Sequence, residues 1–228
     1  MRRASADHAT SPGWPQATRE PVWAVTAPLL DLAVRLLADV RVVGAGNIPR
    51  TGPALLAANH VSHFDPVVLL VVTHRAGRRL RFLTVQEAFD RPVSGWLLRA
   101  GRHIPVGTGS TRLAAVRLAR AALAAGEVVL VYPEGTIPHA AEVAGAKAGA
   151  GLLAVTSGVP VLPVATRGLE RGAGPRWRRR RATVVFGDPV DVSDLAGDAA
   201  GRGRARYEEA STRILEAVRQ LTRTIGVR

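Results

Sequence analysis

The sequence predicts one α/β domain: an α/β/α sandwich with a central mixed, mostly parallel sheet and an N-terminal amphipathic helix. Short apolar runs alternate with helical patterns from residue 54 to residue 186, the order that places a sheet between two helical layers. Of the 228 residues, 47% are hydrophobic, which is enough to fill one such core. No repeat or linker divides the chain.

The chain begins with a polar, proline-bearing segment. Residues 1–20 lack the apolar centre of a signal peptide and are expected to form a disordered arm. Residues 21–228 are expected to form the domain, starting with a helix over residues 22–40. Apolar residues recur there at helical spacing: Val22, Val25, Leu29, Leu32, Leu36 and Leu37. Such a stripe fits a helix on a membrane surface and a helix packed on its own domain equally well.

The remaining elements follow in alternation. Strands are expected at 54–58, 81–85, 103–106, 128–132, 159–165 and 183–186, where apolar and β-branched residues cluster. Helices are expected at 66–72, 96–100, 110–125, 147–157 and 206–225. Gly126 and Gly158 follow two of these helices, as terminal glycines commonly do. The last helix is amphipathic, with Ile214, Val218 and Ile225 on one side.

Charge and composition limit the possible functions. The formal net charge is +13, from 31 basic and 18 acidic residues, which favours anionic partners such as nucleic acid, membranes or phosphorylated molecules. Lys147 is the only lysine, so the other 30 of the 31 basic residues are arginine, and a coding bias, which implies no function, is the default explanation of this skew. The absence of cysteine excludes disulfides, thiolate metal sites and cysteine nucleophiles.

The segment Asn59-His60-Val61-Ser62-His63-Phe64-Asp65 follows an apolar strand pattern. Asp65 precedes Pro66 and an apolar run, which is typical of a helix N-cap followed by proline. His60 is then expected in the loop and Asp65 at the helix start, where a bend brings the carboxylate to the imidazole. Such a pair forms a general base with its orienting partner. The alternative is a capping aspartate near an ordinary loop histidine.

A second segment, Tyr132-Pro133-Glu134-Gly135-Thr136, follows another strand pattern. It is either a tight turn or a carboxylate with exposed amides at the end of a strand, where α/β proteins gather their sites. No metal is expected, because His103 and His139 are not spaced to complete a site with His60 and His63.

At these motifs the chain resembles the glycerolipid acyltransferase family, which includes the 1-acylglycerol-3-phosphate acyltransferases. The family's Asn-His-x-Ser-x-x-Asp is matched by Asn59, His60, Ser62 and Asp65, and its Phe/Tyr-Pro-Glu-Gly-Thr by Tyr132 to Thr136. Its Lys-x-Gly is matched by Lys147-Ala148-Gly149 and its apolar Val-Pro-Val run by Val159 to Val164.

The resemblance implies that His60 and Asp65 are catalytic. Asn59, Ser62, Glu134, Gly135 and Thr136 are expected to bind substrate. The family's second and third motifs commonly supply arginines for the acceptor's phosphate, whereas this chain has Gly107 and Ile137 there. Arg102, Lys147 and Arg167 are the candidates for the missing charge.

The expected activity is transfer of a fatty acyl group from acyl-CoA or an acyl carrier protein to the hydroxyl of a lysophospholipid. Among lysophospholipids, 1-acylglycerol-3-phosphate is the expected acceptor. No cofactor beyond the acyl donor is implied. An acyl thioesterase and a nucleic-acid-binding protein are the alternatives, the second based on the net charge and the arginine-rich run at 176–181. No uncharged apolar stretch reaches the roughly 18–20 residues of a membrane span, so we expect a cytoplasmic protein, peripheral on the inner face of the cell membrane.

Overall fold

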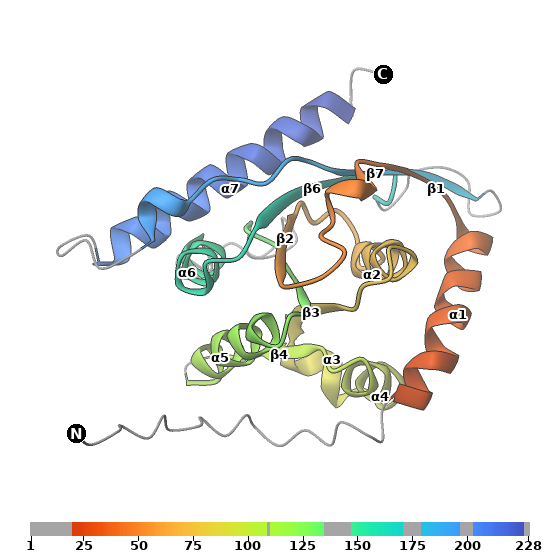
Figure 1. Cartoon of the computed structure of the whole chain (residues 1–228). Helices are drawn as coiled ribbons and strands as arrows, with labels where there is room; N and C mark the ends of the chain where they lie inside the picture. The colour runs from red at the N-terminus through yellow and green to blue at the C-terminus, as the bar shows by residue number, and fades with distance from the viewer. Residues whose placement is uncertain (1–19, 109, 135–146, 171–178, 197–202, 226–228) are drawn as a thin grey trace, which may run out of the picture.

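A seven-stranded sheet lies between two layers of helices in the computed structural model (Figure 1), which describes residues 20–108, 110–134, 147–170, 179–196 and 203–225. The strand order is β1-β7-β6-β2-β5-β3-β4. The predicted α/β/α sandwich is therefore confirmed. The expected arm at residues 1–20 lies almost entirely outside the described residues.

The strands are β1 (Ala38–Val43), β2 (Ala54–Ala58), β3 (Leu80–Val85), β4 (Ile104–Val106), β5 (Val128–Val131), β6 (Val161–Arg167) and β7 (Arg180–Phe186). The helices are α1 (Glu20–Leu37), α2 (Asp65–Arg75), α3 (Gln86–Asp90), α4 (Pro92–Ala100), α5 (Ser110–Ala124), α6 (Lys147–Ser157) and α7 (Gly203–Ile225). Two short 3₁₀ turns span Ala45–Asn47 and Ser193–Leu195.

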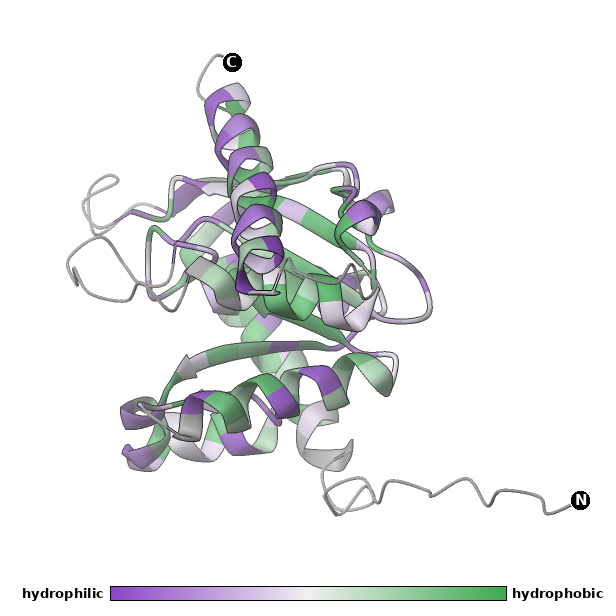
Figure 2. Cartoon of the chain, turned by 90° about the vertical axis from the view of Figure 1, so that its left-hand side faces the viewer, coloured by the Kyte–Doolittle hydropathy of each residue, from purple (hydrophilic) through white to green (hydrophobic). Residues whose placement is uncertain are grey.

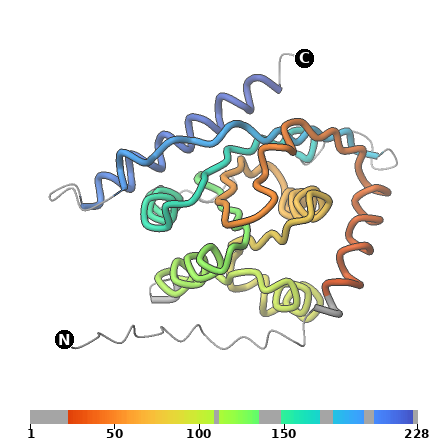
Figure 3. The backbone as a smooth tube through the Cα atoms, viewed as in Figure 1, coloured from red at the N-terminus to blue at the C-terminus, as the bar shows by residue number. Residues whose placement is uncertain are grey.

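Five adjacent strands, from β6 through β2, β5 and β3 to β4, run in the same direction. Their carboxyl ends lie along one side of the sheet, which we call the carboxyl edge; the opposite side is the amino edge. Strand β7 pairs antiparallel with β6, and β1 pairs parallel with β7. Figure 3 shows β1 and β7 side by side, although Ala38 and its partner Arg180 are 142 positions apart in the sequence.

Alternate residues of each strand supply two separate cores. In β2, Leu56 faces the layer that contains α1 and α2, whereas Leu55 faces α5, α6 and α7. All five β2 residues are buried, as expected for a parallel strand covered on both faces. Figure 2 shows α7, which leads to the C-terminus, with hydrophilic and hydrophobic residues interleaved along its length, and Ile214 and Val218 are its buried residues on the predicted side.

Helix α1 is shorter than predicted, because residues 38–43 form the edge strand β1. The helical spacing of the leucines ends at Leu37, and the β-branched residues that follow pair with β7. Ala27 and Val34 are the residues that α1 buries, and Trp23 and Leu30 are partly buried beside them. The predicted stripe of Val25, Leu29, Leu32, Leu36 and Leu37 is exposed in the described part of the chain. Helix α3 was not predicted.

Helices α6 and α7 approach closely at Gly151. A Cβ built at this glycine lies 2.0 Å from the backbone oxygen of Tyr207, and the Gly151 N–H donates a 2.8 Å hydrogen bond to Ser211 Oγ. Gly149 is also in α6, but a Cβ there meets no atom within 4 Å. Only the first of these two glycines is needed for the packing of α7.

The amino edge is held by buried polar side chains. Arg78 is buried and donates to the carbonyl oxygens of Pro49, Gly52 and Gly126, the last at 2.9 Å. Because one guanidinium satisfies three loop carbonyls, it joins segments far apart in sequence. Nearby, Arg81 donates a 2.6 Å hydrogen bond to Glu127 Oε1.

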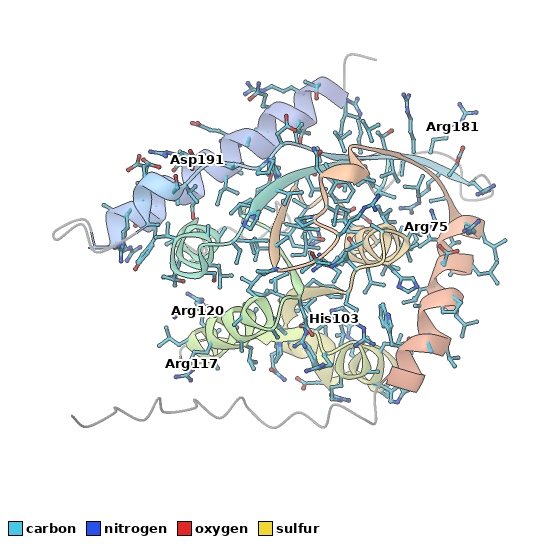
Figure 4. All side chains as sticks on the ribbon, viewed as in Figure 1. Arg75, His103, Arg117, Arg120, Arg181 and Asp191 are labelled. Atoms are coloured by element: carbon cyan, nitrogen blue, oxygen red, sulfur yellow. The ribbon has the colours of Figure 1, made fainter. Side chains whose placement is uncertain are left out.

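His103, labelled in Figure 4, precedes β4 and is buried. Its ring stacks on Phe82 with centroids 3.7 Å apart, and its Nδ1 accepts the Phe82 N–H at 3.3 Å. Burial, aided by the positive charge of Arg81, lowers the pKa of His103 to about 3. The imidazole is therefore neutral in the folded protein throughout the neutral range.

Replacing Gly151 should distinguish close packing from helix propensity. Gly151→Ala places a methyl group against the Tyr207 carbonyl and should lower the free energy of unfolding by about 1–3 kcal/mol. Gly149→Ala, the matched control, should leave it unchanged or raise it by up to about 1 kcal/mol, since alanine favours the helix. Urea unfolding measures both variants, and equal effects would contradict the close-packing argument.

His103 should make the fold sensitive to acid. The unfolded chain binds a proton near pH 6.5 but the folded chain only near pH 3, so stability is lost as the pH falls between these values. Urea titrations of the wild type should show a steeper loss between pH 6.5 and pH 4 than those of His103→Gln, by up to ~1.4 kcal/mol per pH unit. The exposed His63, changed to Gln, is the control and should leave the slope unchanged.

Candidate active site

The candidate site lies at the carboxyl edge, on the loops that follow β2 and β5. Asn59 and His60 leave the buried strand β2, and Tyr132 leaves its neighbour β5. The paired register of Ala57 with Val131 brings the ends of these two strands together. Two segments about seventy residues apart in the printed sequence therefore meet, as both motifs require.

Asp65 and His60 form the centre of the site. His60 Nδ1 lies 3.1 Å from Asp65 Oδ2, and the Asp65 carboxylate is fully buried. The same oxygen accepts the backbone N–H groups of Val61 at 2.7 Å and Ser62 at 2.8 Å. A carboxylate only accepts hydrogen bonds, so the His60 proton is assigned to Nδ1, which leaves the Nε2 lone pair free to take a proton.

Asp65 was predicted to cap the next helix, and this is wrong. Phe64 is the N-cap of α2, and Asp65 is already helical, ahead of Pro66. The Asp65 side chain turns back and binds the N–H groups of the preceding loop instead of those of its own helix. The helix begins one residue earlier than expected, and the carboxylate is thereby aimed at His60.

Asn59 and Ser62 are buried and hold the loop in shape. Asn59 Nδ2 donates to the Thr166 carbonyl at 2.9 Å, and Asn59 Oδ1 accepts the Thr166 N–H at 2.7 Å. These two hydrogen bonds to the backbone of β6 resemble one more pair of the sheet ladder, directly before His60. Ser62 Oγ accepts the Phe64 N–H at 3.2 Å. The predicted substrate-binding role of both residues stays a prediction.

Tyr132 lies against the imidazole. Its ring stacks on His60 with centroids 4.1 Å apart and an interplanar angle of 22°. The stack limits rotation of the imidazole about χ2, while the contact with Asp65 fixes which nitrogen faces inward. His60 therefore has one orientation, with 14% of its side chain exposed.

Of the other predicted site residues, some lie at the carboxyl edge and others fall outside the described residues. Glu134 is exposed just after β5, at the carboxyl edge, whereas Gly135, Thr136 and Ile137 lie outside the described residues. Lys147 begins α6, and its side chain is not described. Gly107 follows β4 at the carboxyl edge.

The structure does not bring Arg102 to His60. Arg102 precedes β4, so it lies at the amino edge, with Nη1 3.9 Å from Glu127 Oε1. Arg167 ends β6 at the carboxyl edge and is exposed. Of these two arginines, only Arg167 lies on the same edge as the imidazole.

His63 is exposed, and its ring lies edge-on to His60 with centroids 6.4 Å apart. Within the described ranges, no three side chains of histidine, aspartate or glutamate gather closely enough to hold a metal ion. The chemistry that this geometry offers is proton abstraction by His60 Nε2, with Asp65 stabilising the imidazolium that forms.

Two contributions were missed by sequence reasoning. Thr166 bonds Asn59 through its backbone carbonyl and N–H, and its Oγ1 donates to Asn59 Oδ1 at 3.3 Å; no local sequence pattern reveals such a contact. Tyr132 stacks on His60. The only sequence signal for this contact was an aromatic residue at the end of the predicted strand 128–132.

Comparison with known proteins gives a consistent result. The family model described as acyltransferase matches residues 39–167, a span that contains β2, the His60 loop, β5 and all of β6. The crystal structure of the 1-acyl-sn-glycerophosphate acyltransferase PlsC from Thermotoga maritima is similar, with a TM-score of 0.69, 26% identity, and coverage of 92% of this chain and 82% of that chain.

Curated relatives include a 1-acyl-sn-glycerol-3-phosphate acyltransferase of Pseudomonas aeruginosa, 30% identical over 78% of this chain and 68% of the relative. Uncharacterized proteins of Mycobacterium bovis and Mycobacterium tuberculosis are 40% identical over 49% of this chain. The chain covers 30% of the length of these mycobacterial relatives.

Proposed function

The chain belongs to the acyltransferase family, and from this premise we propose that it moves a fatty acyl group from a thioester donor to the hydroxyl of a lysophospholipid. The proposed donor is acyl-CoA or an acyl carrier protein, and the proposed acceptor is 1-acylglycerol-3-phosphate, in phospholipid biosynthesis. The observation that carries the proposal is the buried Asp65 carboxylate 3.1 Å from His60 Nδ1.

In the proposed reaction, His60 Nε2 removes the proton of the acceptor hydroxyl as its oxygen attacks the thioester carbonyl. The tetrahedral intermediate then collapses: the new ester forms, the carbon–sulfur bond breaks, and the thiolate takes the proton from the imidazolium. Asp65 stabilises that imidazolium and keeps the Nδ1 proton in place. No covalent acyl-enzyme is needed, because the acceptor itself is the nucleophile.

Arg167 is the proposed partner of the acceptor's phosphate. It is exposed at the end of β6, directly after Thr166, which Asn59 holds. An arginine fork suits a phosphate group. Gly107 and Ile137 stand where the acyltransferase family commonly has arginines. In this proposal, Arg167 supplies the positive charge that these two positions lack.

We further propose that the protein binds peripherally to an anionic membrane through α1. Val25, Leu29, Leu32 and Leu36 are 54–65% exposed along the side of α1 opposite Ala27 and Val34. Exposed apolar residues also lie on α4, namely Val93, Trp96 and Leu97. Exposed apolar side chains along one side of a helix, as on α1, are typical of membrane or protein contact sites. None of the described helices meets the length and hydropathy of a membrane span.

Loss of the imidazole tests the reaction. His60→Ala should lower acyl transfer by about 10²–10⁴-fold, the usual contribution of a general base, without changing the circular dichroism spectrum. His63→Ala is the matched control, since His63 is exposed and is not bonded to Asp65, and should stay within about threefold of wild type.

The assay uses labelled acyl-CoA with 1-acylglycerol-3-phosphate and measures labelled phospholipid and free thiol in parallel. Thiol release that does not need the acceptor would point to a thioesterase instead. Full acyl transfer by purified His60→Ala would rule out the proposed base.

Removing apolar side chains from α1 tests membrane binding. Leu29→Ser should weaken sedimentation with phosphatidylglycerol-containing vesicles by about tenfold, because burying a leucine contributes roughly 1.5–3 kcal/mol. The double variant Leu29→Ser/Leu36→Ser should bind more weakly still. Leu113→Ser on α5 removes an equally exposed leucine, 64% against 60%, and should have no effect; equal losses in both would contradict a surface centred on α1.

A further inference from the structure

Two buried polar atoms beside His60 have no hydrogen-bond partner within the described part of the chain: Asp65 Oδ1 and the Tyr132 hydroxyl. Leaving such an atom unsatisfied costs about 1–3 kcal/mol. Both atoms belong to side chains that contact the same imidazole, Asp65 through Oδ2 at 3.1 Å and Tyr132 through a ring stack at 4.1 Å. One unsatisfied atom can donate and the other can only accept.

The chemistry of the two groups is complementary. Burial, together with the negative charge of Asp65, raises the pKa of the Tyr132 hydroxyl well above its usual value. The phenol therefore keeps its proton and is a donor at every pH at which the protein works. Asp65 Oδ2 already accepts three N–H groups, whereas Oδ1 accepts none.

We propose that Tyr132 is a positioning residue for the His60–Asp65 pair, with its hydroxyl donating to Asp65 Oδ1 through one buried water. A water between two buried polar groups commonly satisfies both. With both carboxylate oxygens engaged, the carboxylate cannot rotate, so Oδ2 stays on the loop amides and on Nδ1. The imidazole is then fixed on one side by the stack and on the other by an immobile acceptor.

The expected effect of Tyr132 on catalysis rests on the proposed function, whereas its effect on the orientation of the His60–Asp65 pair does not. The ring stack alone explains an aromatic residue at position 132, but it gives no use to a buried hydroxyl on which the charge of Asp65 acts. Phenylalanine keeps the ring and loses only the oxygen, so Tyr132→Phe isolates the proposed contact. Tyr207→Phe is the matched control: its hydroxyl accepts from Arg206 Nη2 at 2.9 Å, on α7.

The direct test is the tautomer of His60 in the free protein, read from ¹⁵N chemical shifts of labelled histidine, with His60→Gln used for assignment. The wild type and Tyr207→Phe should hold the proton on Nδ1, and Tyr132→Phe should show a mixture of tautomers. In the acyl-transfer assay, kcat of Tyr132→Phe should fall about tenfold while KM stays within twofold. An unchanged tautomer and an unchanged kcat would overturn the proposal.

A crystal structure of the wild type gives a second readout that needs no variant. A water bonded to both atoms, or direct contact between them, supports the positioning role. A Tyr132 hydroxyl bonded to another group, away from Asp65, overturns it. Because the tautomer and the crystal contact are measured without substrate, they still report on Tyr132 if no acyl transfer is found.

Discussion

A single carboxylate oxygen organises the candidate site. Asp65 Oδ2 accepts N–H groups from His60, Val61 and Ser62, so the loop after β2 curls around the first residue of α2. A buried charge is tolerated in a protein only where such donors compensate for lost water. The hydrogen bonds that compensate the buried carboxylate therefore also place the His60 proton on Nδ1 and leave Nε2 as the reactive nitrogen.

Two charged groupings that hold the fold lie at the opposite edge of the sheet from the site. His60, Tyr132 and Glu134 lie at the carboxyl edge, after their strands. Arg78 and the Arg81–Glu127 pair lie at the amino edge, where they join loops and strand starts. These fold-stabilising side chains are thus separated from His60 by the length of the strands, whereas Asn59 stabilises the fold at the carboxyl edge itself by joining the His60 loop to β6.

Sequence reasoning succeeded where patterns are local. The buried runs of β2 and β5 and the spacing of α7 were recognisable because each reflects a single repeating environment. It failed where the outcome depends on partners: residues 38–43 form a strand because they pair with β7, and the Asp65 side chain binds the loop amides of Val61 and Ser62 instead of those of its own helix. Arg102 was a candidate for the charge that Gly107 and Ile137 lack, but it precedes β4, and the parallel pairing of β4 with β3 places it at the amino edge.

The reversed direction of β7 and β1 determines where α1 arrives. Ala38 pairs with Arg180, at the start of β7 and on the edge where β6 ends, while Trp23 near the other end of α1 stacks edge-on against His74 at the end of α2. Figure 4 shows Arg75 of α2 beside α1, and its Nε contacts Asp31 at 2.6 Å. The exposed leucines of α1 therefore extend from the amino edge to the carboxyl edge, where His60 lies. In the proposed orientation, an acceptor diffusing sideways in the leaflet would meet the imidazole by a search in two dimensions, without first being extracted into water.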